Sequence, residues 1–220
     1  MNSLEIITTG DGSHSLLNKD LNETYHSIHG AVRESQHVFI DNGLQFWIEK
    51  NSKPTVKIFE VGFGTGLNVL LTLLHKTNIN IEYTTLEAFP IEENVWSLLN
   101  YADDDQKLVF NGIHGSKWNH SSEINTHFLL NKVKNKLQLV NLVPENYDVI
   151  YFDAFAPSKQ PEMWELPMLK KIFDSMTDKG VFVTYCAKGQ LKRDLKNLGF
   201  TVETLPGPPG KKEMVRAIKN

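Results

Sequence analysis

The chain has 220 residues, enough for one domain with a packed core, and 40% of them are hydrophobic. Its formal net charge of −3 gives no overall signal for nucleic-acid binding. A single cysteine, Cys186, excludes an internal disulfide framework and is typical of a reducing compartment. The first residues lack the pattern of a signal peptide, and no apolar stretch is long enough to span a membrane. We therefore expect a cytoplasmic protein with no membrane partner.

The first half of the chain predicts an extension followed by alternating strands and helices. Residues 1–54 carry short β-like pieces such as 37–40, and we expect them to form an N-terminal extension that packs on a main domain at 55–220. The elements predicted next are a buried strand at 56–61, a helix at 66–76, a strand at 81–88 and a helix at 91–102.

The second half continues this alternation after a segment without a clear pattern. Residues 103–144 predict only a short strand and an insertion. The elements that follow are a strand in 147–157 that ends in a polar-aromatic loop, a helix around 162–176 broken or kinked near Pro167, a strand at 180–187, a helix at 189–199 and two closing β-rich runs. We predict an α/β, Rossmann-like fold, whose mostly parallel sheet ends in a C-terminal antiparallel hairpin.

A glycine-rich loop joins the first predicted strand of the main domain to its first helix. Gly62, Gly64 and Gly66 stand on alternate residues of the run FEVGFGTGLN. Glycines permit positive φ angles and close approach of a ligand, and the loop places backbone N–H groups at the carboxyl end of the strand. The spacing differs from the dinucleotide pattern G-x-G-x-x-G, because Leu67 occupies the third glycine position, and no Lys-Ser/Thr pair follows as in a P-loop.

Two acidic residues narrow the ligand class of this loop. Glu60 precedes the first glycine by two residues; it would repel a pyrophosphate but can accept a hydrogen bond from an ammonium group or an ordered water. Glu87 ends the second strand, where a carboxylate can accept from both hydroxyls of a ribose. S-adenosylmethionine has an amino-acid end, a ribose and no phosphate, so the arrangement favours it. The structural alternative is a glycine turn that only packs the helix on the strand.

A second group of residues follows the next central strand. In YFDAFAPSKQPEMWE (151–165), Asp153 comes directly after the apolar strand, at the edge where doubly wound sheets bind ligands. A carboxylate there can orient the N–H bonds of an amine and stabilise the charge that forms when its nitrogen is methylated. Phe155 can stack on a base or face a cation. Alternatively, Asp153 caps the following turn or helix, and both roles can coexist.

The C-terminal part of the chain carries a local excess of positive charge. From Cys186 to Asn220 there are eight Lys or Arg residues against three Asp or Glu residues. Such a run is most often a solvated face, and it can also contact the phosphates of a nucleic acid. His26 and His29 have no matching cysteine or carboxylate pattern, so we expect no metal site.

These motifs together resemble the MnmC-type tRNA methyltransferases, in particular their stand-alone, MnmD-like form. The resemblance covers almost the whole chain, and the block DAFAP followed by K-x-P-x-M-W is its most specific part. It implies that residues 55–220 are a Rossmann-like S-adenosylmethionine methyltransferase domain. The similar runs are ETYHSIHGAVRESQHVFI (23–40), FEVGFGTGLN (59–68), LEAFP (86–90), YFDAFAPSKQPEMW (151–164) and GPPGKKEMVRA (207–217).

The resemblance implies a specific reaction. A methyl group would pass from S-adenosylmethionine to the 5-aminomethyl group of the tRNA wobble uridine, giving 5-methylaminomethyl(-2-thio)uridine, with Asp153 as the catalytic residue. The partner would be a tRNA anticodon stem-loop, bound with modest affinity that falls with salt. We expect cofactor binding by Glu60, Gly62, Phe63, Gly64, Thr65, Gly66, Asn68, Glu87, Ala88 and Phe89. We expect substrate binding by Tyr25, Phe155, Pro157, Met163 and Trp164, and by Lys211, Lys212 and Glu213 at the tRNA entrance.

The chain departs from the family pattern in three respects. The stretch 131–138 lacks the acidic residue expected near the adenine and carries Lys132, Lys134 and Asn135 instead. Ala154 stands where relatives often have glycine, which slightly narrows the loop. We also expect the family's fused FAD-dependent oxidase to be absent from a chain of this length.

Other functions stay open at this point. A small-molecule amine methyltransferase or a polyamine synthase-like enzyme would use a similar donor and a similar strand-end Asp, but would give no use to the basic residues at 188–196 and 211–212. The glycine spacing disfavours a dinucleotide-dependent oxidoreductase. A non-catalytic module that binds nucleotide or RNA would have no need of Asp153. The residues do not indicate the oligomeric state, and a monomer is compatible with each function.

Overall fold

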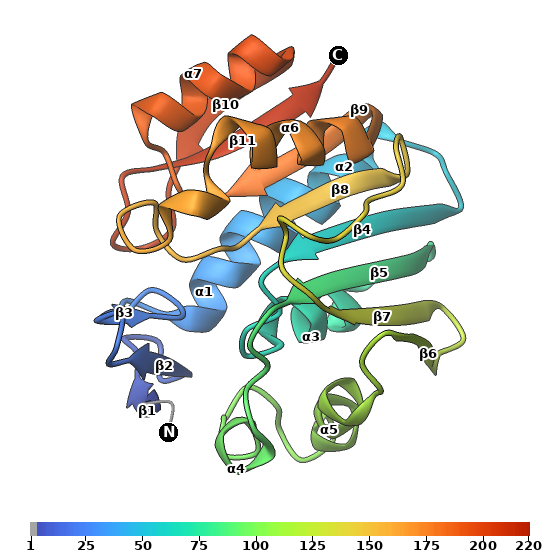
Figure 1. Cartoon of the computed structure of the whole chain (residues 1–220). Coiled ribbons are helices and arrows are strands. Elements are labelled where there is room, and N and C mark those ends of the chain that lie inside the picture. The colour runs from blue at the N-terminus through green and yellow to red at the C-terminus, as the bar shows by residue number, and fades with distance from the viewer. Residues whose placement is uncertain (1–3) are drawn as a thin grey trace.

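The computed structural model describes residues 4–220 and contains two β-sheets (Figure 1). A small antiparallel sheet near the N-terminus is formed by β1 (Leu4–Thr8), β2 (His14–Asn18) and β3 (Glu23–Thr24). The large sheet has eight strands in the order β10-β11-β9-β8-β4-β5-β7-β6. Their bounds are β4 Thr55–Val61, β5 Asn80–Glu87, β6 His120–Asn125, β7 Phe128–Lys134, β8 Tyr147–Phe152, β9 Met176–Thr184, β10 Phe200–Pro206 and β11 Glu213–Lys219.

The pairing of the large sheet confirms the predicted fold class. The five central strands β9, β8, β4, β5 and β7 are parallel, and β11 and β10 add an antiparallel hairpin at the C-terminal edge. The opposite edge is also antiparallel, because β6 pairs with β7 in a hairpin that the pattern at 103–144 did not resolve. β6 has the sequence HSSEIN and is largely exposed. It could not be predicted from the sequence pattern, because it lacks the alternating apolar residues that mark a strand.

Five helices follow strands of the large sheet, and three of them differ from the prediction, including α5, which lies where only a short strand and an insertion were expected. They are α3 (Leu67–Leu74), α4 (Glu93–Trp96), α5 (Lys107–Gly115), α6 (Leu166–Ser175) and α7 (Gly189–Leu198), with a 3-10 turn at Pro161–Met163 before α6. The helix expected at 91–102 is limited to α4. Pro167 does not kink a helix; it lies in the first turn of α6, where its missing N–H leaves no bond unmade. Gly199 ends α7 as expected, with a φ of 107°.

The strand-like piece predicted at 37–40 is wrong, because these residues are helical. α1 (Ala31–Ser35), the π-helical segment η1 (Gln36–Gln45) and α2 (Phe46–Lys50) form one continuous helix, since the residues at both junctions have helical φ and ψ angles. Val38, Phe39 and Ile40 are buried. An apolar run this short fits a buried helix as well as a strand.

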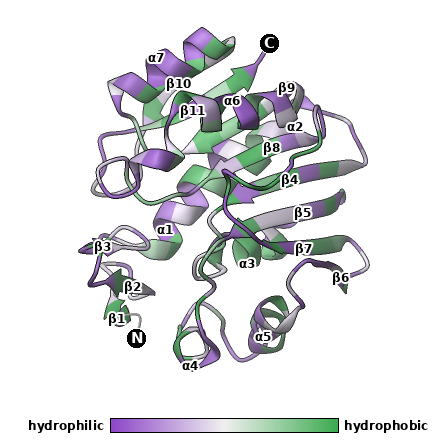
Figure 2. Ribbon diagram, in the orientation of Figure 1, coloured by the Kyte–Doolittle hydropathy of each residue, from purple (hydrophilic) through white to green (hydrophobic). Residues whose placement is uncertain are grey.

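A hydrophobic core lies on each face of the large sheet. On one face, residues of the helix 31–50, α3 and α5 pack together, including Phe39, Trp47 and Leu70. On the other face, α6 and α7 contribute residues such as Ile172 and Leu195. Figure 2 shows hydrophobic residues along the central strands and mainly hydrophilic ones along α7. The helix 31–50 thus shares a core with the sheet; a domain boundary at residue 54 stays a prediction. No helix within residues 4–220 is long and apolar enough to cross a membrane.

Candidate active site

A cavity of about 1130 Å³ opens at the carboxyl ends of the central strands. Its walls come from the glycine loop after β4 and from the loops after β5, β7 and β8. The N-terminal segment and the turn between β10 and β11 complete the walls. The cavity therefore lies where loops converge at the edge of a doubly wound sheet, the usual ligand site of such folds.

The backbone of the glycine loop favours glycine at all three of its glycine positions, since Gly66 also has a positive φ, of 75°. Gly62 has a φ of 96° and Gly64 a φ of 49°, in the region that L side chains rarely adopt. A Cβ atom at Gly62 would lie 2.6 Å from the carbonyl oxygen of Asp153, and one at Gly64 would lie 3.2 Å from the ring of Tyr25. The glycine loop thus packs closely against the loop after β8, which carries Asp153, and against Tyr25 of the N-terminal segment.

Glu87 braces this loop from the end of β5. Its carboxylate accepts hydrogen bonds from the backbone N–H of Gly64 at 3.1 Å and from that of Phe89 at 2.8 Å. The side chain also lines the cavity. A carboxylate held in this way keeps lone pairs directed at a ligand, because each oxygen can accept more than one hydrogen bond.

Asn68, in the first turn of α3, joins two acidic side chains. Its Nδ2 atom donates to Glu60 Oε1 at 3.0 Å and to Asp153 Oδ2 at 2.9 Å. Thr85 donates to the other oxygen of Glu60 at 2.6 Å. Glu60 is fully buried and does not line the cavity, so it lies one layer behind Asn68 and orients it. The Oδ1 atom of Asn68 is buried without a hydrogen-bond partner among residues 4–220.

Burial raises the pKa values of Glu60 and Asp153, so that both carboxyl groups can carry a proton near neutral pH. Removal from water raises the pKa of Glu60 to about 8, against the effect of its hydrogen bonds from Thr85 and Asn68. Removal from water also raises the pKa of Asp153 to about 7. The negative charge of Glu34 adds to that rise, while the hydrogen bond from Asn68 and the positive charge of Lys211 oppose it. Asp153 can therefore exchange a proton at physiological pH.

Aromatic side chains form one side of the cavity beside Asp153. The rings of Tyr25 and Phe155 meet edge to face, with centroids 5.0 Å apart. Trp164 does not line the cavity, but its Nε1 atom donates to the carbonyl oxygen of Phe155 at 2.8 Å and so fixes that loop. The Tyr185 hydroxyl donates to the carbonyl oxygen of Ala154 at 2.8 Å. The wall can accept a flat ring.

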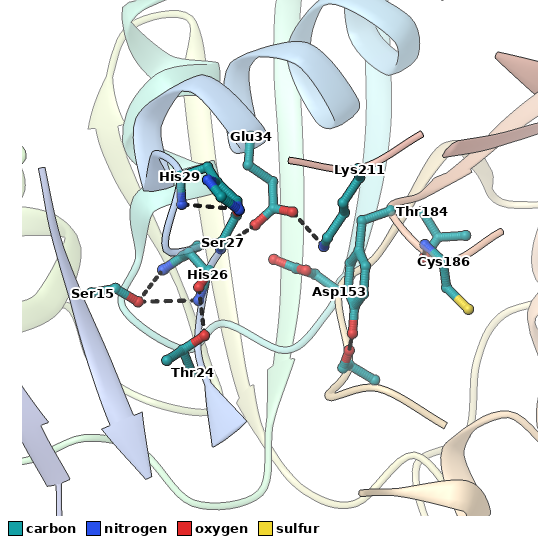
Figure 3. A network of polar contacts seen from close by, with 12 residues as sticks. Ser15, Thr24, His26, Ser27, His29, Glu34, Asp153, Thr184, Cys186 and Lys211 are labelled. Carbon is teal, nitrogen blue, oxygen red and sulfur yellow. Dashed lines mark hydrogen bonds and ion pairs between the residues drawn. The ribbon is translucent and has the colours of Figure 1, made fainter. Parts of the chain in front are cut away.

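An ion pair from distant parts of the chain stands beside this wall. Lys211 Nζ lies 2.5 Å from Glu34 Oε1 and 3.7 Å from the centroid of the Tyr185 ring. The other Glu34 oxygen accepts from the backbone N–H of Ser27 at 2.6 Å. Figure 3 shows Glu34, Lys211 and Asp153 next to one another. Sequence reasoning included Glu34 only in an N-terminal run and missed Tyr185, because their roles depend on partners remote in the chain.

The structure brings most of the predicted site residues to one cavity. Those that line it are Tyr25, Gly62, Phe63, Gly64, Thr65, Asn68, Glu87, Ala88, Phe89, Asp153, Phe155, Met163 and Lys211. Those that do not line it are Glu60, Gly66, Pro157, Trp164, Lys212 and Glu213. Lys212 is exposed to solvent, and Glu213 pairs with Lys192 at 3.2 Å. Among residues 4–220, no group of three or more His, Cys, Asp or Glu side chains is placed to hold a metal ion.

The fold and the cavity together define a Rossmann-like enzyme of the methyltransferase class. A family model described as S-adenosyl-L-methionine-dependent methyltransferase matches residues 101–220, more than half of the chain. The chain belongs to this family, and its cofactor is S-adenosylmethionine.

Several known proteins are similar to the chain. The tRNA 5-methylaminomethyl-2-thiouridine biosynthesis bifunctional protein MnmC of Pseudoalteromonas atlantica is 30% identical over 97% of this chain and 33% of its own length. The MnmC protein of Idiomarina loihiensis is 28% identical over 88% of this chain and 35% of its own length. The chain thus spans about one third of the length of these relatives. The crystal structure of MnmC2 from Aquifex aeolicus has a TM-score of 0.81 and 25% identity, over 99% of this chain and 70% of that one.

The residues present fit this cofactor. The unpartnered Asn68 Oδ1 can accept from an ammonium group, such as the one at the amino-acid end of S-adenosylmethionine. Glu87 can accept from ribose hydroxyls, and the glycine loop leaves room for close approach. In the stretch that lacks the expected acidic residue, Lys132 is buried and donates to the carbonyl oxygen of His114 at 2.6 Å. Residues 135–139 line the cavity instead.

Proposed function

We propose that the chain methylates the amine of the 5-aminomethyl group on the wobble (2-thio)uridine of tRNA, giving 5-methylaminomethyl(-2-thio)uridine. The observation that carries this proposal is the position of Asp153, whose carboxyl lines the cavity, is held by Asn68 and adjoins the wall that contains Tyr25 and Phe155. The similarity to MnmC proteins supports the choice of acceptor. Residues 55–220 would be the methyltransferase domain, with 1–54 as an extension that completes the wall.

Asp153 would prepare the amine for transfer. S-adenosylmethionine supplies an electrophilic methyl group when it is bound. An aminomethyl group is largely protonated at neutral pH and must lose a proton to become a nucleophile. The Asp153 carboxylate can accept that proton or orient the remaining N–H bonds, since burial raises its pKa to about 7. Once Asp153 has passed that proton to solvent, or where it has only oriented the N–H bonds, its ionised carboxylate faces the positive charge that forms on nitrogen and stabilises it.

The surface around the cavity supports an RNA partner. Three exposed apolar side chains stand at its mouth: Ile28, Phe89 and Leu139 are 59%, 66% and 69% exposed. The Lys136 ammonium lies 5.9 Å from the centre of the Phe89 ring. Aromatic rings beside cations suit unstacked bases of a single-stranded loop. Toward the C-terminus, Lys188, Arg193, Lys196 and Lys212 are exposed and could contact phosphates.

This proposal also has consequences for location and assembly. A tRNA-modifying enzyme works where tRNA is, so we expect the chain to act in the cytoplasm. All the residues assigned to the reaction lie on one chain, so the proposed chemistry requires no second copy.

The test is nucleoside mass spectrometry on tRNA that carries the 5-aminomethyl group, incubated with the protein and isotopically labelled S-adenosylmethionine. The expected product is labelled 5-methylaminomethyl(-2-thio)uridine. Asp153→Asn should lower turnover by about 100-fold or more, because it can neither take the proton nor carry the charge, while the dissociation constant for S-adenosylmethionine stays within about threefold. Unchanged turnover in this variant would remove Asp153 from the reaction.

A second candidate is a small-molecule amine methyltransferase or a polyamine synthase-like enzyme. Asp153 and Glu34 are among six acidic residues that line the cavity, and carboxylates also suit a small polycation. The same labelled assay with a set of polyamines and simple amines decides between the two. Transfer to these amines without transfer to tRNA would favour the second candidate.

A further inference from the structure

The ion pair between Glu34 and Lys211 is built into the wall of the cavity. Only 6% of the Glu34 side chain and 30% of the Lys211 side chain are exposed. Both line the cavity together with Asp153. An exposed ion pair contributes little to stability, because water screens it. A pair enclosed beside a third ionisable group affects the pKa of that group more strongly, because less water lies between them.

The pair is one of several contacts that fasten the β10–β11 hairpin to the helix 31–50 and the residues just before it. Gly210 lies so close to the ring of His29 that a Cβ atom on it would overlap the ring. The Nε2 atom of His37 lies 2.9 Å from the carbonyl oxygen of Pro206. The guanidinium of Arg216 lies 3.6 Å from the centre of the Phe46 ring. Lys211 is thus held in place by the docking of the whole turn.

The two members of the ion pair have opposite effects on the pKa of Asp153. The charge of Glu34 raises the pKa of Asp153, and the charge of Lys211 lowers it. Other groups act on the same carboxyl or are influenced by it: Asn68 donates a hydrogen bond to it from α3, and the acid of Glu60 and the phenols of Tyr83 and Tyr185 interact with its charge. Of these groups, Lys211 is the one that brings a positive charge.

Building on the proposed function, we propose that Glu34 and Lys211 are a positioning pair for the methyl acceptor. Their ion pair fixes the β10–β11 turn against α1 and balances its own charges beside Asp153. Ionised Asp153 then presents its negative charge to an incoming amine beside a pair whose own charges cancel. Neither Glu34 nor Lys211 takes part in the transfer itself.

The test uses Glu34→Gln and Lys211→Met in the full chain. The glutamine amide oxygen would still accept from Ser27, and the methionine stem would still pack on Tyr185. The protein is labelled with 13C at the aspartate carboxyl carbons, and the Asp153 signal is identified by its loss in Asp153→Asn. The titration midpoint should fall in Glu34→Gln and rise in Lys211→Met, each by about half to one pH unit. The acid limb of kcat/KM for tRNA should move in the same directions.

Controls separate this role from a structural one. Lys192→Met breaks the Lys192–Glu213 pair at the same hairpin but away from the cavity wall, so it should leave the Asp153 midpoint unchanged. The double variant Glu34→Gln/Lys211→Met should return the midpoint to within about 0.3 pH unit of the wild type, because the opposing effects cancel. If Glu34→Gln does not fold, Lys211→Met alone decides, since the midpoint must rise.

Midpoints that do not move, or that move in the same direction in both single variants, would overturn the positioning pair. The carboxyl titration needs no acceptor, so it is independent of the proposed function. Opposed shifts in a protein that methylates no tRNA would reject the tRNA proposal and leave the charge arrangement intact. Opposed shifts without any change in the pH profile of a protein that does methylate tRNA would show that the pair does not act on the acceptor.

Discussion

At the scale of single residues, the site depends on two acids that the fold removes from water. Glu60 and Asp153 share Asn68 as a donor, so one amide group organises both carboxyls. Keeping an acid in a buried position opposes its ionisation, and the folded protein therefore binds a proton that the unfolded chain releases. This arrangement favours proton exchange at Asp153 and reduces stability at alkaline pH.

The stability of the ligand-free protein should fall as pH rises from about 6.5 to 8; below that range the buried His26 and His114, whose pKa values burial lowers to about 4 and about 3, oppose the effect of the two acids. Burial raises the pKa of Glu60 from 4.5 to about 8, so its contribution is fully present below pH 4.5 and is lost as pH rises through 8. Asp153 acts with the same sign through a pKa of about 7. Urea unfolding at a series of pH values should show a loss on the order of a few kcal/mol.

The variant Glu60→Gln should flatten this slope, because it removes one of the two groups. The matched control is Glu123→Gln on the exposed edge strand β6, which should leave the slope unchanged. A wild-type protein that becomes more stable between pH 6.5 and 8 would contradict the assignment of these two acids.

At the scale of elements, the sequence predicted those helices and strands whose signals lie in neighbouring residues. The strand before Gly62, the amphipathic helix α3 and the glycine end of α7 were predicted correctly, because each depends on neighbouring residues. β6 was missed because its residues are mainly polar, and 37–40 was misassigned because a short apolar run fits two structures. The Glu34–Lys211 pair was not predictable, because its partners are 177 positions apart.

The glycine loop provides a prediction at this scale. Gly62→Ala would place a Cβ atom 2.6 Å from the Asp153 carbonyl oxygen at a φ of 96°. We expect the loop to shift and the dissociation constant for S-adenosylmethionine to rise by about tenfold or more, measured by calorimetry.

Gly112 in α5 offers a matched control for this substitution. It lies in a helix, and a Cβ atom there would meet nothing within 4 Å. Gly112→Ala should leave cofactor affinity unchanged and stabilise the protein by about 0.5–1 kcal/mol. Equal effects of the two substitutions on cofactor binding would show that the loop conformation at Gly62 does not matter.

At the scale of the whole molecule, positive charge gathers near the C-terminal edge of the sheet although the net charge is −3. Lys188 and Lys212 are exposed there, whereas Lys211 is engaged with Glu34. The basic surface and the cavity wall thus use different lysines of one turn. Only the exposed lysines are suitable for testing long-range attraction to a polyanion.

The double charge reversal Lys188→Glu/Lys212→Glu should weaken tRNA binding and flatten its salt dependence. Each lost phosphate contact lowers the slope of log affinity against log salt by about 1. Filter binding over a range of salt concentrations measures this slope, and affinity for S-adenosylmethionine should not change. Lys107→Glu in α5, on the far side of the sheet from α7, is the control (Figure 1). A double variant with the wild-type slope would exclude these lysines from the tRNA interface.

The position of β11 between β9 and β10 has a consequence for synthesis on the ribosome. β11 is the last strand of this sheet in chain order, yet it pairs with both neighbours, so β10 can join the sheet only after β11 has been inserted. Lys211 directly precedes β11 and meets Glu34 only at that stage. The glycine loop and Glu87 are complete much earlier. A nascent chain can therefore shape the half of the cavity proposed for the methyl donor well before it can close the half proposed for the amine.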